Sequence, residues 1–153
     1  MRFTVIPSLR LFCVAAAVVA PLAVSAQLKV TSLTVEHMKN PSTVDVPAPR
    51  LSWINEAKDG KVRGERQTAY RIVVASSAEK LDAGEFDVWD SGKVPSEQST
   101  LVPYGGRRLT SGQDCYWKVK TWNARKKASE WSETGYWGMG LLNARDWKAQ
   151  WIG

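Results

Sequence analysis

Acidic side chains gather around one tryptophan in the middle of the chain. Glu85, Asp87 and Asp90 flank Trp89 in the segment EFDVWDSG. Two carboxylates are enough to hydrolyse a glycosidic bond, and in a retaining enzyme they stand about 5 Å apart. These residues have a simpler use, because an aspartate before Ser-Gly accepts hydrogen bonds from the backbone of a tight turn. The spacing favours turn chemistry, and we assign no catalytic residue.

The sequence offers little for other kinds of site. His37 is the single histidine, so a serine nucleophile has one possible base, and a zinc ion lacks the three or four ligands that it needs. We therefore expect His37 to be an ordinary surface residue. The glycines of YGGRR and DAGE do not precede a long amphipathic helix, which argues against a phosphate-binding loop. The sequence predicts no metal site and no cofactor.

Aromatic side chains are the remaining candidates for binding, since the sequence has eight tryptophans. Aromatic rings on an open sheet face can bind the apolar C–H faces of sugars. The possible carbohydrate contacts are Trp89, Tyr104 and Trp122. Packing is the competing interpretation, and for Trp122 and Trp131 we favour cation–π contacts with basic side chains on an outer sheet face.

Short alternating segments separated by turns must position these side chains. The strand candidates are LKVTSLTVE (28–36), RLSWIN (50–55), QTAYRIVVAS (67–76), DVWDSGKV (87–94), STLVPY (99–104), CYWKVKTWN (115–123) and ASEWSETGYWGMG (128–140). About seven strands at nearly regular spacing predict an all-β fold, an antiparallel two-sheet β-sandwich of the fibronectin type III or immunoglobulin-like kind.

Local signals refine this outline. The apolar phase slips between Val30 and Leu33, which predicts a bulge. Ser77 and Gly84 bracket a short helix. Residues 87–94 are expected to form a hairpin with Gly92 at positive φ. Alternation in 115–123 places Trp117, Val119 and Thr121 on the inner face and Tyr116, Lys118, Lys120 and Trp122 on the outer face.

The first 26 residues resemble a secretory signal peptide. Arg2 and Arg10 precede an apolar run, and small residues follow it up to Ala26, so we expect cleavage before Gln27. The alternative is a membrane anchor, but Pro21 interrupts the apolar run and the run is too short to span comfortably. The prediction is export to the periplasm or the cell exterior, with no membrane span left after cleavage.

The mature chain is mildly basic and has one cysteine. Removing Arg2 and Arg10 lowers the 21 basic residues to 19 against 15 acidic ones, a net charge of +4. Scattered basic residues are usually solvated loop residues, so we expect no nucleic-acid partner. Cys115 cannot form an intrachain disulfide in the mature chain. The domain must therefore be held together by its core.

An ordered set of short motifs resembles a known family. PRLSW (49–53), QTAYRIVVAS (67–76), DVWDSGKV (87–94), YWKVKTWN (116–123), SEWSE (129–133) and the run from GMGLL to DWKAQWIG (138–153) follow in the order found at the N-terminal end of bacterial α-L-rhamnosidases of glycoside hydrolase family 78. Each motif is weak alone, but their order is specific. The family often has Asp-Gly in its last turn, where this chain has NARKKA.

The resemblance implies a division of the chain. Residues 1–26 would be the cleaved signal peptide, 27–141 the fibronectin-like sandwich, and 142–153 a connector and the start of a missing next domain. In that family the catalytic acids lie in a later α/α-barrel, so none of them can be carried over. Trp151 and Ile152 are expected to lack their natural partners and to fold back or lie exposed.

The implied function is that of a non-catalytic accessory domain of a truncated, secreted α-L-rhamnosidase. Its partners would be the downstream domains of the parent enzyme, which releases terminal L-rhamnose, and rhamnose-containing glycans. The alternative is a free-standing carbohydrate-binding or protein-interaction module, for which the tryptophan count is the motive. Activity of this chain alone is not expected.

Overall fold

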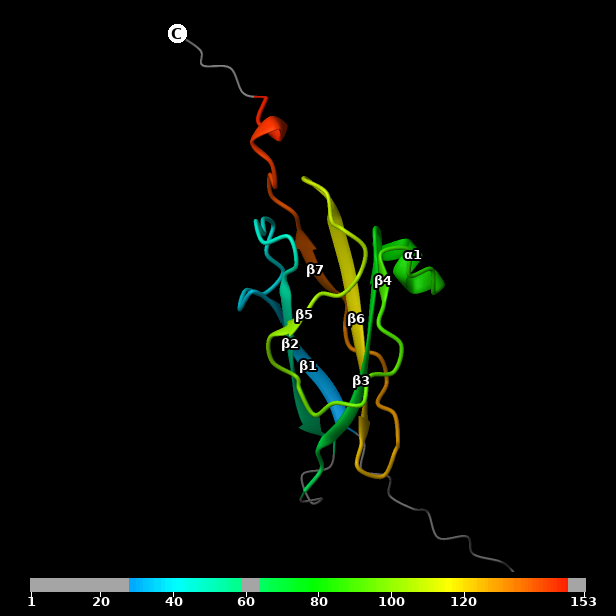
Figure 1. Cartoon of the computed structure of the whole chain (residues 1–153). Helices are drawn as coiled ribbons and strands as arrows, with labels where there is room; N and C mark the ends of the chain where they lie inside the picture. Colours follow the sequence, from blue (N-terminus) through cyan, green and yellow to red (C-terminus); the bar gives the residue numbers. More distant parts are fainter. Residues whose placement is uncertain (1–27, 59–63, 149–153) are drawn as a thin grey trace, which may run out of the picture.

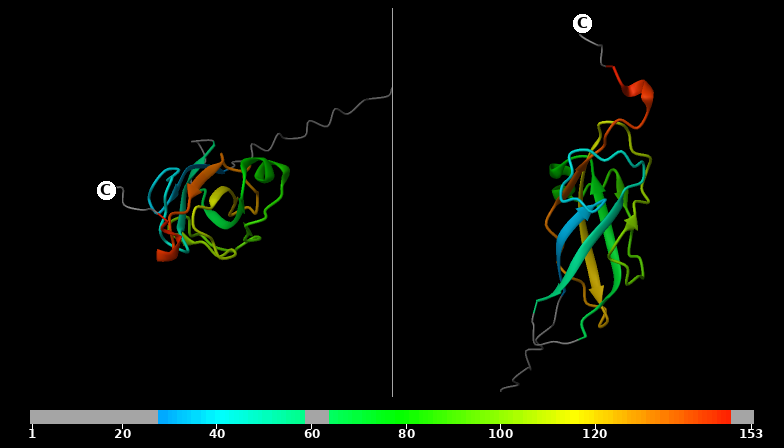
Figure 2. Two further views of the ribbon diagram at one scale, coloured as in Figure 1. Left: turned by 90° about the horizontal axis from the view of Figure 1, so that it is seen from above. Right: turned by 90° about the vertical axis from the view of Figure 1, so that its left-hand side faces the viewer.

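Two antiparallel sheets pack face to face in the computed structural model, which describes residues 28–58 and 64–148 (Figures 1 and 2). The strands are β1 (Leu28–Val35), β2 (Arg50–Ala57), β3 (Gln67–Ala75), β4 (Trp89–Asp90), β5 (Val102–Pro103), β6 (Asp114–Asn123) and β7 (Gly135–Gly138). The sheet orders are β1-β2-β5 and β4-β3-β6-β7. A helix α1 (Ala78–Ala83) and a 3₁₀ turn η1 (Ala144–Asp146) complete the described elements. The predicted all-β sandwich is confirmed.

Alternating side chains explain the central pair of strands. β3 and β6 are antiparallel, with Ile72 opposite Val119 and Val74 opposite Trp117. These four side chains are fully buried between the sheets. The intervening residues of β6 are only partly exposed on the outer face, as the alternation predicts.

The first strand contains the predicted bulge. Its register against β2 shifts between Thr31 and Thr34, and Ser32 adopts φ 53° at that point. The shift returns Leu33 and Val35 to the buried side, so both halves of the strand contribute to one core.

The predicted hairpin at residues 87–94 is wrong. The segment runs beside β3 as one antiparallel edge, since Val88, Ser91 and Val94 donate their N–H groups to the carbonyls of Val74, Ile72 and Tyr70. Gly92, at φ 61°, takes up an irregularity in that edge instead of reversing the chain. The long β3 offers acceptors along its whole length, and these outcompete a local turn.

Serine hydroxyls continue the opposite edge of the same sheet. Ser132 Oγ accepts from Val119 N at 3.0 Å, and Ser129 Oγ accepts from Thr121 N at 3.0 Å. The backbone N–H groups of the two serines donate to the carbonyls of the same β6 residues. Residues 129–132 therefore follow β6 before β7 begins, which places Trp131 over the outer face.

The helix begins and ends as the sequence predicts. Ser77 Oγ accepts from Lys80 N, and Gly84 ends α1 in the left-handed conformation at φ 79°. Leu81 packs with Val73 and Ala75, which point outward from β3. The helix thus covers apolar residues that would otherwise face water.

A buried glutamine joins the two sheets at one end of the core. Gln67 Oε1 accepts from Trp53 Nε1 and Asn55 Nδ2, both at 2.9 Å. Its Nε2 donates to the carbonyls of Ser96 and Gln98. Within residues 28–58 and 64–148, no buried side-chain nitrogen or oxygen lacks a hydrogen-bond partner.

The two ends of the described chain lie at opposite ends of the sandwich (Figure 1). The signal-peptide prediction for 1–26 and the predictions for Trp151 and Ile152 lie outside the described residues. Of the helices that the structure describes, none is long and apolar enough to cross a membrane.

Candidate functional site

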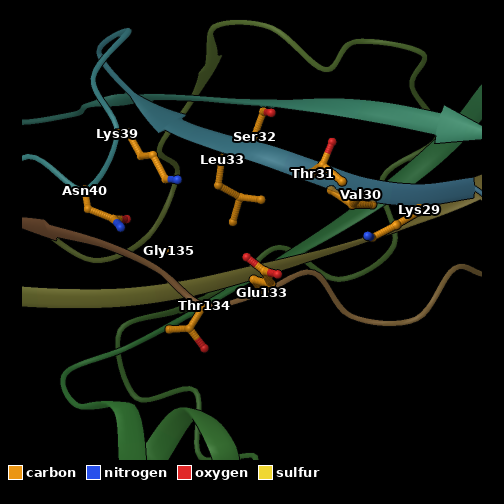
Figure 3. Close-up of a pocket in the computed structure, with 10 residues that line it drawn as sticks. All are labelled: Lys29, Val30, Thr31, Ser32, Leu33, Lys39, Asn40, Glu133, Thr134 and Gly135. Carbon is orange, nitrogen blue, oxygen red and sulfur yellow. The ribbon is translucent and has the colours of Figure 1, made fainter.

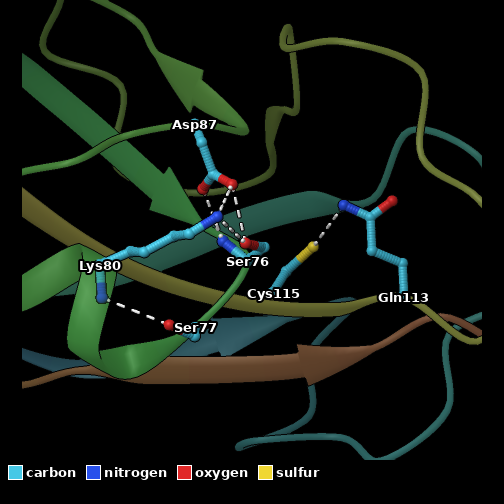
Figure 4. A network of polar contacts seen from close by, with 6 residues as sticks. All are labelled: Ser76, Ser77, Lys80, Asp87, Gln113 and Cys115. Atoms are coloured by element: carbon cyan, nitrogen blue, oxygen red, sulfur yellow. Dashed lines mark hydrogen bonds and ion pairs between the residues drawn. The ribbon is translucent and has the colours of Figure 1, made fainter.

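Asp87, one of the three clustered carboxylates, lies at the edge where α1 meets β3 (Figure 4). It accepts hydrogen bonds from Ser76 N at 2.9 Å, Ser76 Oγ at 2.7 Å and Lys80 Nζ at 2.7 Å. Burial alone would raise the pKa of Asp87, but these hydrogen bonds outweigh it and hold the pKa well below its usual range. Such a carboxylate stays ionised and cannot serve as a general acid near neutral pH.

The second carboxylate is also engaged. Asp90 forms two hydrogen bonds with the Arg71 guanidinium, at 2.9 and 2.6 Å, and accepts from Gly92 N at 2.9 Å. The Arg71 hydrogen bonds lower the pKa of Asp90. Glu85 is exposed just after the helix. The arrangement fixes a loop and an edge, and it offers no proton donor opposite a base.

Two of the three predicted carbohydrate contacts lie together at the margin of the core. The Trp89 and Tyr104 rings meet edge to face with centroids 5.1 Å apart. The Tyr104 hydroxyl donates to the Arg107 carbonyl at 2.8 Å, and burial raises the pKa of Tyr104 to about 12. Tyr104 is 7% exposed, so its ring contributes little open surface.

The third predicted contact lies elsewhere. Trp122 is on the outer face of β6, where Lys93 Nζ stands 4.6 Å from its ring centroid. The structure therefore brings Trp89 and Tyr104 together and places Trp122 apart from them. Binding of sugar by any of the three stays a prediction.

A stack of cations and rings covers the outer face of the four-stranded sheet. Arg71 lies 5.9 Å from the ring centroids of both Phe86 and Trp131. Lys120 Nζ lies 4.5 Å from the Trp131 centroid. Contacts of this geometry are favourable by about 0.5–1 kcal/mol each at exposed sites. The structure thus places Trp131 among basic side chains, and it gives Trp122 a lysine from the edge segment in place of Lys118 or Lys120.

Sequence reasoning missed two members of this face. Phe86 follows the helix and gives no strand signal, and no local pattern in the sequence points to its place on this face. The sequence predicts a hairpin around Lys93. In the structure its neighbours Ser91 and Val94 bond to β3, and this places Lys93 over Trp122. The close approach of Lys118 to Asp82, at 2.6 Å, likewise depends on the helix position.

A groove of about 240 Å³ runs between β1 and the start of β7 (Figure 3). Lys29 and Lys39 stand toward its two ends, and Glu133 lies between them (Figure 3). Val30 and Leu33 contribute an apolar floor. Charged side chains beside an open strand edge discourage pairing with another chain, so the groove fits protection of that edge.

The residues that could hold a metal are scattered. His37 is exposed, as expected, and residues 28–58 and 64–148 contain no group of three His, Cys, Asp or Glu side chains that could hold a metal ion. Cys115 is fully buried, and burial raises the pKa of its thiol to about 12. A thiol in that state is a poor nucleophile.

The end of the sandwich where the chain leaves carries its own polar cluster. Ser111 Oγ accepts from Leu142 N at 2.8 Å and donates to an oxygen of Asp146. Asn143 Nδ2 donates to the same Asp146 oxygen at 3.0 Å. Trp147 follows with 68% of its surface exposed. These contacts join a loop before β6 to the segment that follows β7.

Residues 30–143 match the family described as the Rha78A-like, N-terminal immunoglobulin domain. The chain belongs to this family. The resemblance drawn from the ordered motifs is therefore confirmed. The match begins in β1 and ends just before η1, so it takes in both sheets of the sandwich and the helix.

Members of the immunoglobulin-domain family occur in much longer proteins. An α-L-rhamnosidase of Streptomyces avermitilis is 46% identical over 125 residues, which are 82% of this chain and 12% of the relative. One from Formosa agariphila is 45% identical over 114 residues, 74% of this chain and 12% of the relative. The chain thus spans about an eighth of the length of these relatives.

Solved structures show the same sandwich. The crystal structure of the Streptomyces avermitilis α-L-rhamnosidase complexed with L-rhamnose superposes with a TM-score of 0.75 at 45% identity, over 82% of this chain and 12% of that one. The α-L-rhamnosidase from Dictyoglumus thermophilum gives a TM-score of 0.77 at 34% identity, over 84% of this chain and 14% of that one.

Proposed function

We propose that this chain is a non-catalytic N-terminal accessory domain of an exported α-L-rhamnosidase, an enzyme that removes terminal L-rhamnose from glycans. The observation that carries the proposal is the match of residues 30–143 to an N-terminal immunoglobulin domain that occupies about 12% of the α-L-rhamnosidases. The ionised, fully engaged Asp87 and Asp90 support it, because neither is free for acid catalysis.

The domain would serve as a scaffold for the rest of the enzyme. A sandwich with its termini at opposite ends suits a position at the start of a longer polypeptide (Figure 1). Inter-domain interfaces within a chain are usually modest in area and partly polar. The downstream domains of the parent enzyme are the proposed partners, reached through the end that carries Trp147.

Activity is the first test. The mature chain, residues 27–153, is incubated with an aryl α-L-rhamnoside, with a complete α-L-rhamnosidase as the positive control. We expect no release of the aryl group above background. Turnover that survives repurification and disappears on unfolding would overturn the proposal.

The gene supplies a second test of the parentage. We expect the DNA downstream of the Gly153 codon to encode a continuation into an α/α-barrel. An unrelated gene after a stop codon would favour a free-standing module.

Export is tested by mass spectrometry of the secreted protein, which should begin at Gln27.

Carbohydrate binding is the second candidate function. The observation that favours it is Trp122, a partly exposed ring beside the exposed Lys93. Rhamnose-containing glycans are titrated while tryptophan fluorescence and amide chemical shifts are followed, with Trp147→Ala as the matched control for Trp122→Ala. No change at millimolar sugar would end this candidate.

A further inference from the structure

The segment that leaves the last strand is anchored by side chains from a distant turn. Ser111 lies in a turn in which Gln113 N donates to the Thr110 carbonyl, and Gly112 N donates to the carbonyls of Met139 and Gly140. The turn is therefore itself attached to the end of β7. A hydroxyl placed on it has a fixed position relative to the sheet.

That hydroxyl makes two hydrogen bonds to the departing chain. It accepts from Leu142 N at 2.8 Å and donates to Asp146. Residues 143–145 are therefore attached to the same hydroxyl just before they begin and just after they end. Leu142 also packs against the main core. One serine thus connects the sheet, the core and the next turn of chain.

The departing chain is also folded on itself. Asp146 N donates to the Asn143 carbonyl at 3.0 Å, and Asn143 Nδ2 donates back to the Asp146 carboxylate at 3.0 Å. Trp147 N donates to the Ala144 carbonyl at 3.3 Å. A flexible linker would carry none of these bonds, because its backbone would be solvated.

We propose that Ser111, Asn143 and Asp146 form a clamp that holds the chain exit, residues 142–148, in one direction. The connection to whatever follows the domain is then rigid and not a flexible linker. The purpose of the clamp rests on the proposed function, since a fixed exit matters where another domain follows. A joint that is ordered in advance removes the entropy that a docking domain would otherwise lose.

The clamp also fixes the position of the exposed ring of Trp147. Trp147 is 68% exposed and follows the last clamped residue directly. A large ring held in one place can act as an anchor for an apolar surface of the following domain, because aromatic anchors tend to dominate the energy of interfaces. Without the clamp the same ring would sweep through many directions.

Amide dynamics in the mature chain test the clamp. Amide exchange and ¹⁵N heteronuclear NOE values are measured in the wild type and in Ser111→Ala. Ser96→Ala is the control, because the Ser96 hydroxyl accepts only from Gln98 N in its own loop. We expect Ser111→Ala to speed exchange at Leu142 N by about tenfold and to lower the NOE of residues 143–148, as loss of a hydrogen bond of ordinary strength allows. Exchange in β6 should stay unchanged.

A second variant separates the two arms of the clamp. Asp146→Ala should loosen residues 143–148 and leave Leu142 N protected, because Ser111 still accepts from it. NOE values for residues 143–147 at the level of an unfolded chain in the wild type would overturn the proposal. Equal protection of Leu142 N in the wild type and Ser111→Ala, with equal NOE values for residues 143–148 in these two proteins and Asp146→Ala, would also overturn it.

The outcome is independent of the proposed function. Release of an aryl group from an α-L-rhamnoside would end the accessory role and leave the clamp measurements intact. If the chain is inactive but residues 143–148 are mobile, the clamp proposal fails and the accessory role still stands.

Discussion

Replacing Trp131 with alanine should destabilise the domain substantially, because the ring covers the outer face of β3. Val73 and Ala75 point outward there and are fully buried by α1, Phe86 and Trp131. The mutation would uncover this small apolar cluster and remove the contacts with Arg71 and Lys120. Those losses concern packing and need no sugar.

The magnitude follows from area and charge. A tryptophan that buries about 120 Å² loses about 3 kcal/mol on truncation at 25 cal/mol per Å². The two cation–π contacts add about 1 kcal/mol after discounting for their partial exposure, and relaxation of the loop returns a similar amount. We therefore expect a net loss of about 3 kcal/mol, or about 12 °C in Tm for a domain of this size.

Urea unfolding followed by circular dichroism measures the loss. Trp147→Ala is the matched control, since that ring is 68% exposed and its removal should change the free energy of unfolding by under about 0.5 kcal/mol. A double-mutant cycle with Lys120→Met, which keeps the aliphatic stem, isolates the charge contribution.

The reasoning fails if Trp131→Ala unfolds within about 1 kcal/mol of the wild type, well below the expected packing loss. It also fails if the cycle gives no coupling between Trp131 and Lys120. Loss of glycan binding with unchanged stability would assign the ring to recognition.

Three further changes are expected. Gly135→Ala should lower the free energy of unfolding in urea by about 2–3 kcal/mol, because a β-carbon there would overlap the Trp117 ring. A variant that unfolds at the same urea concentration as the wild type would refute the overlap. Because the pKa of Asp87 is lowered by folding, its contribution to stability is full above about pH 4 and is lost progressively as pH falls below this value. Asp87→Asn should therefore weaken the fall in the free energy of unfolding at acid pH. An unchanged fall would contradict the ion pair with Lys80. Cys115, with its pKa raised to about 12, should react with a disulfide reagent only as fast as the domain opens; rapid labelling of the folded chain would show that the thiol is accessible.

The sequence predicts best where one physical rule decides alone. Alternation assigned both faces of β6, and the Ser77 and Gly84 caps bracketed α1, because side-chain period and cap chemistry are local. The slipped phase between Val30 and Leu33 predicted the bulge for the same reason. In each case the residue types within one short segment are enough to indicate its local structure.

Prediction fails where long-range pairing decides. Asp90-Ser91-Gly92 has the composition of a hairpin turn, yet the carbonyls of Ile72 and Tyr70 capture the segment and keep it straight. Nothing local states that β3 has an open edge of that length. The clamp at Ser111 is not predicted from the sequence for the same reason, because the partners of Ser111 come more than thirty residues later.

The outer face shows why aromatic counts are a weak guide to sugar binding here. Val73 and Ala75 must be covered, and a bulky ring on the neighbouring loop covers them. Once in place, Trp131 is flanked by Arg71 and Lys120, so a sugar would have to displace a cation before it could stack on the ring. Among residues 28–58 and 64–148, Trp122 has one contact of this kind, with the exposed Lys93. If any ring on this face binds a glycan, it is therefore Trp122, where a sugar displaces one flexible lysine and leaves the cover of β3 in place.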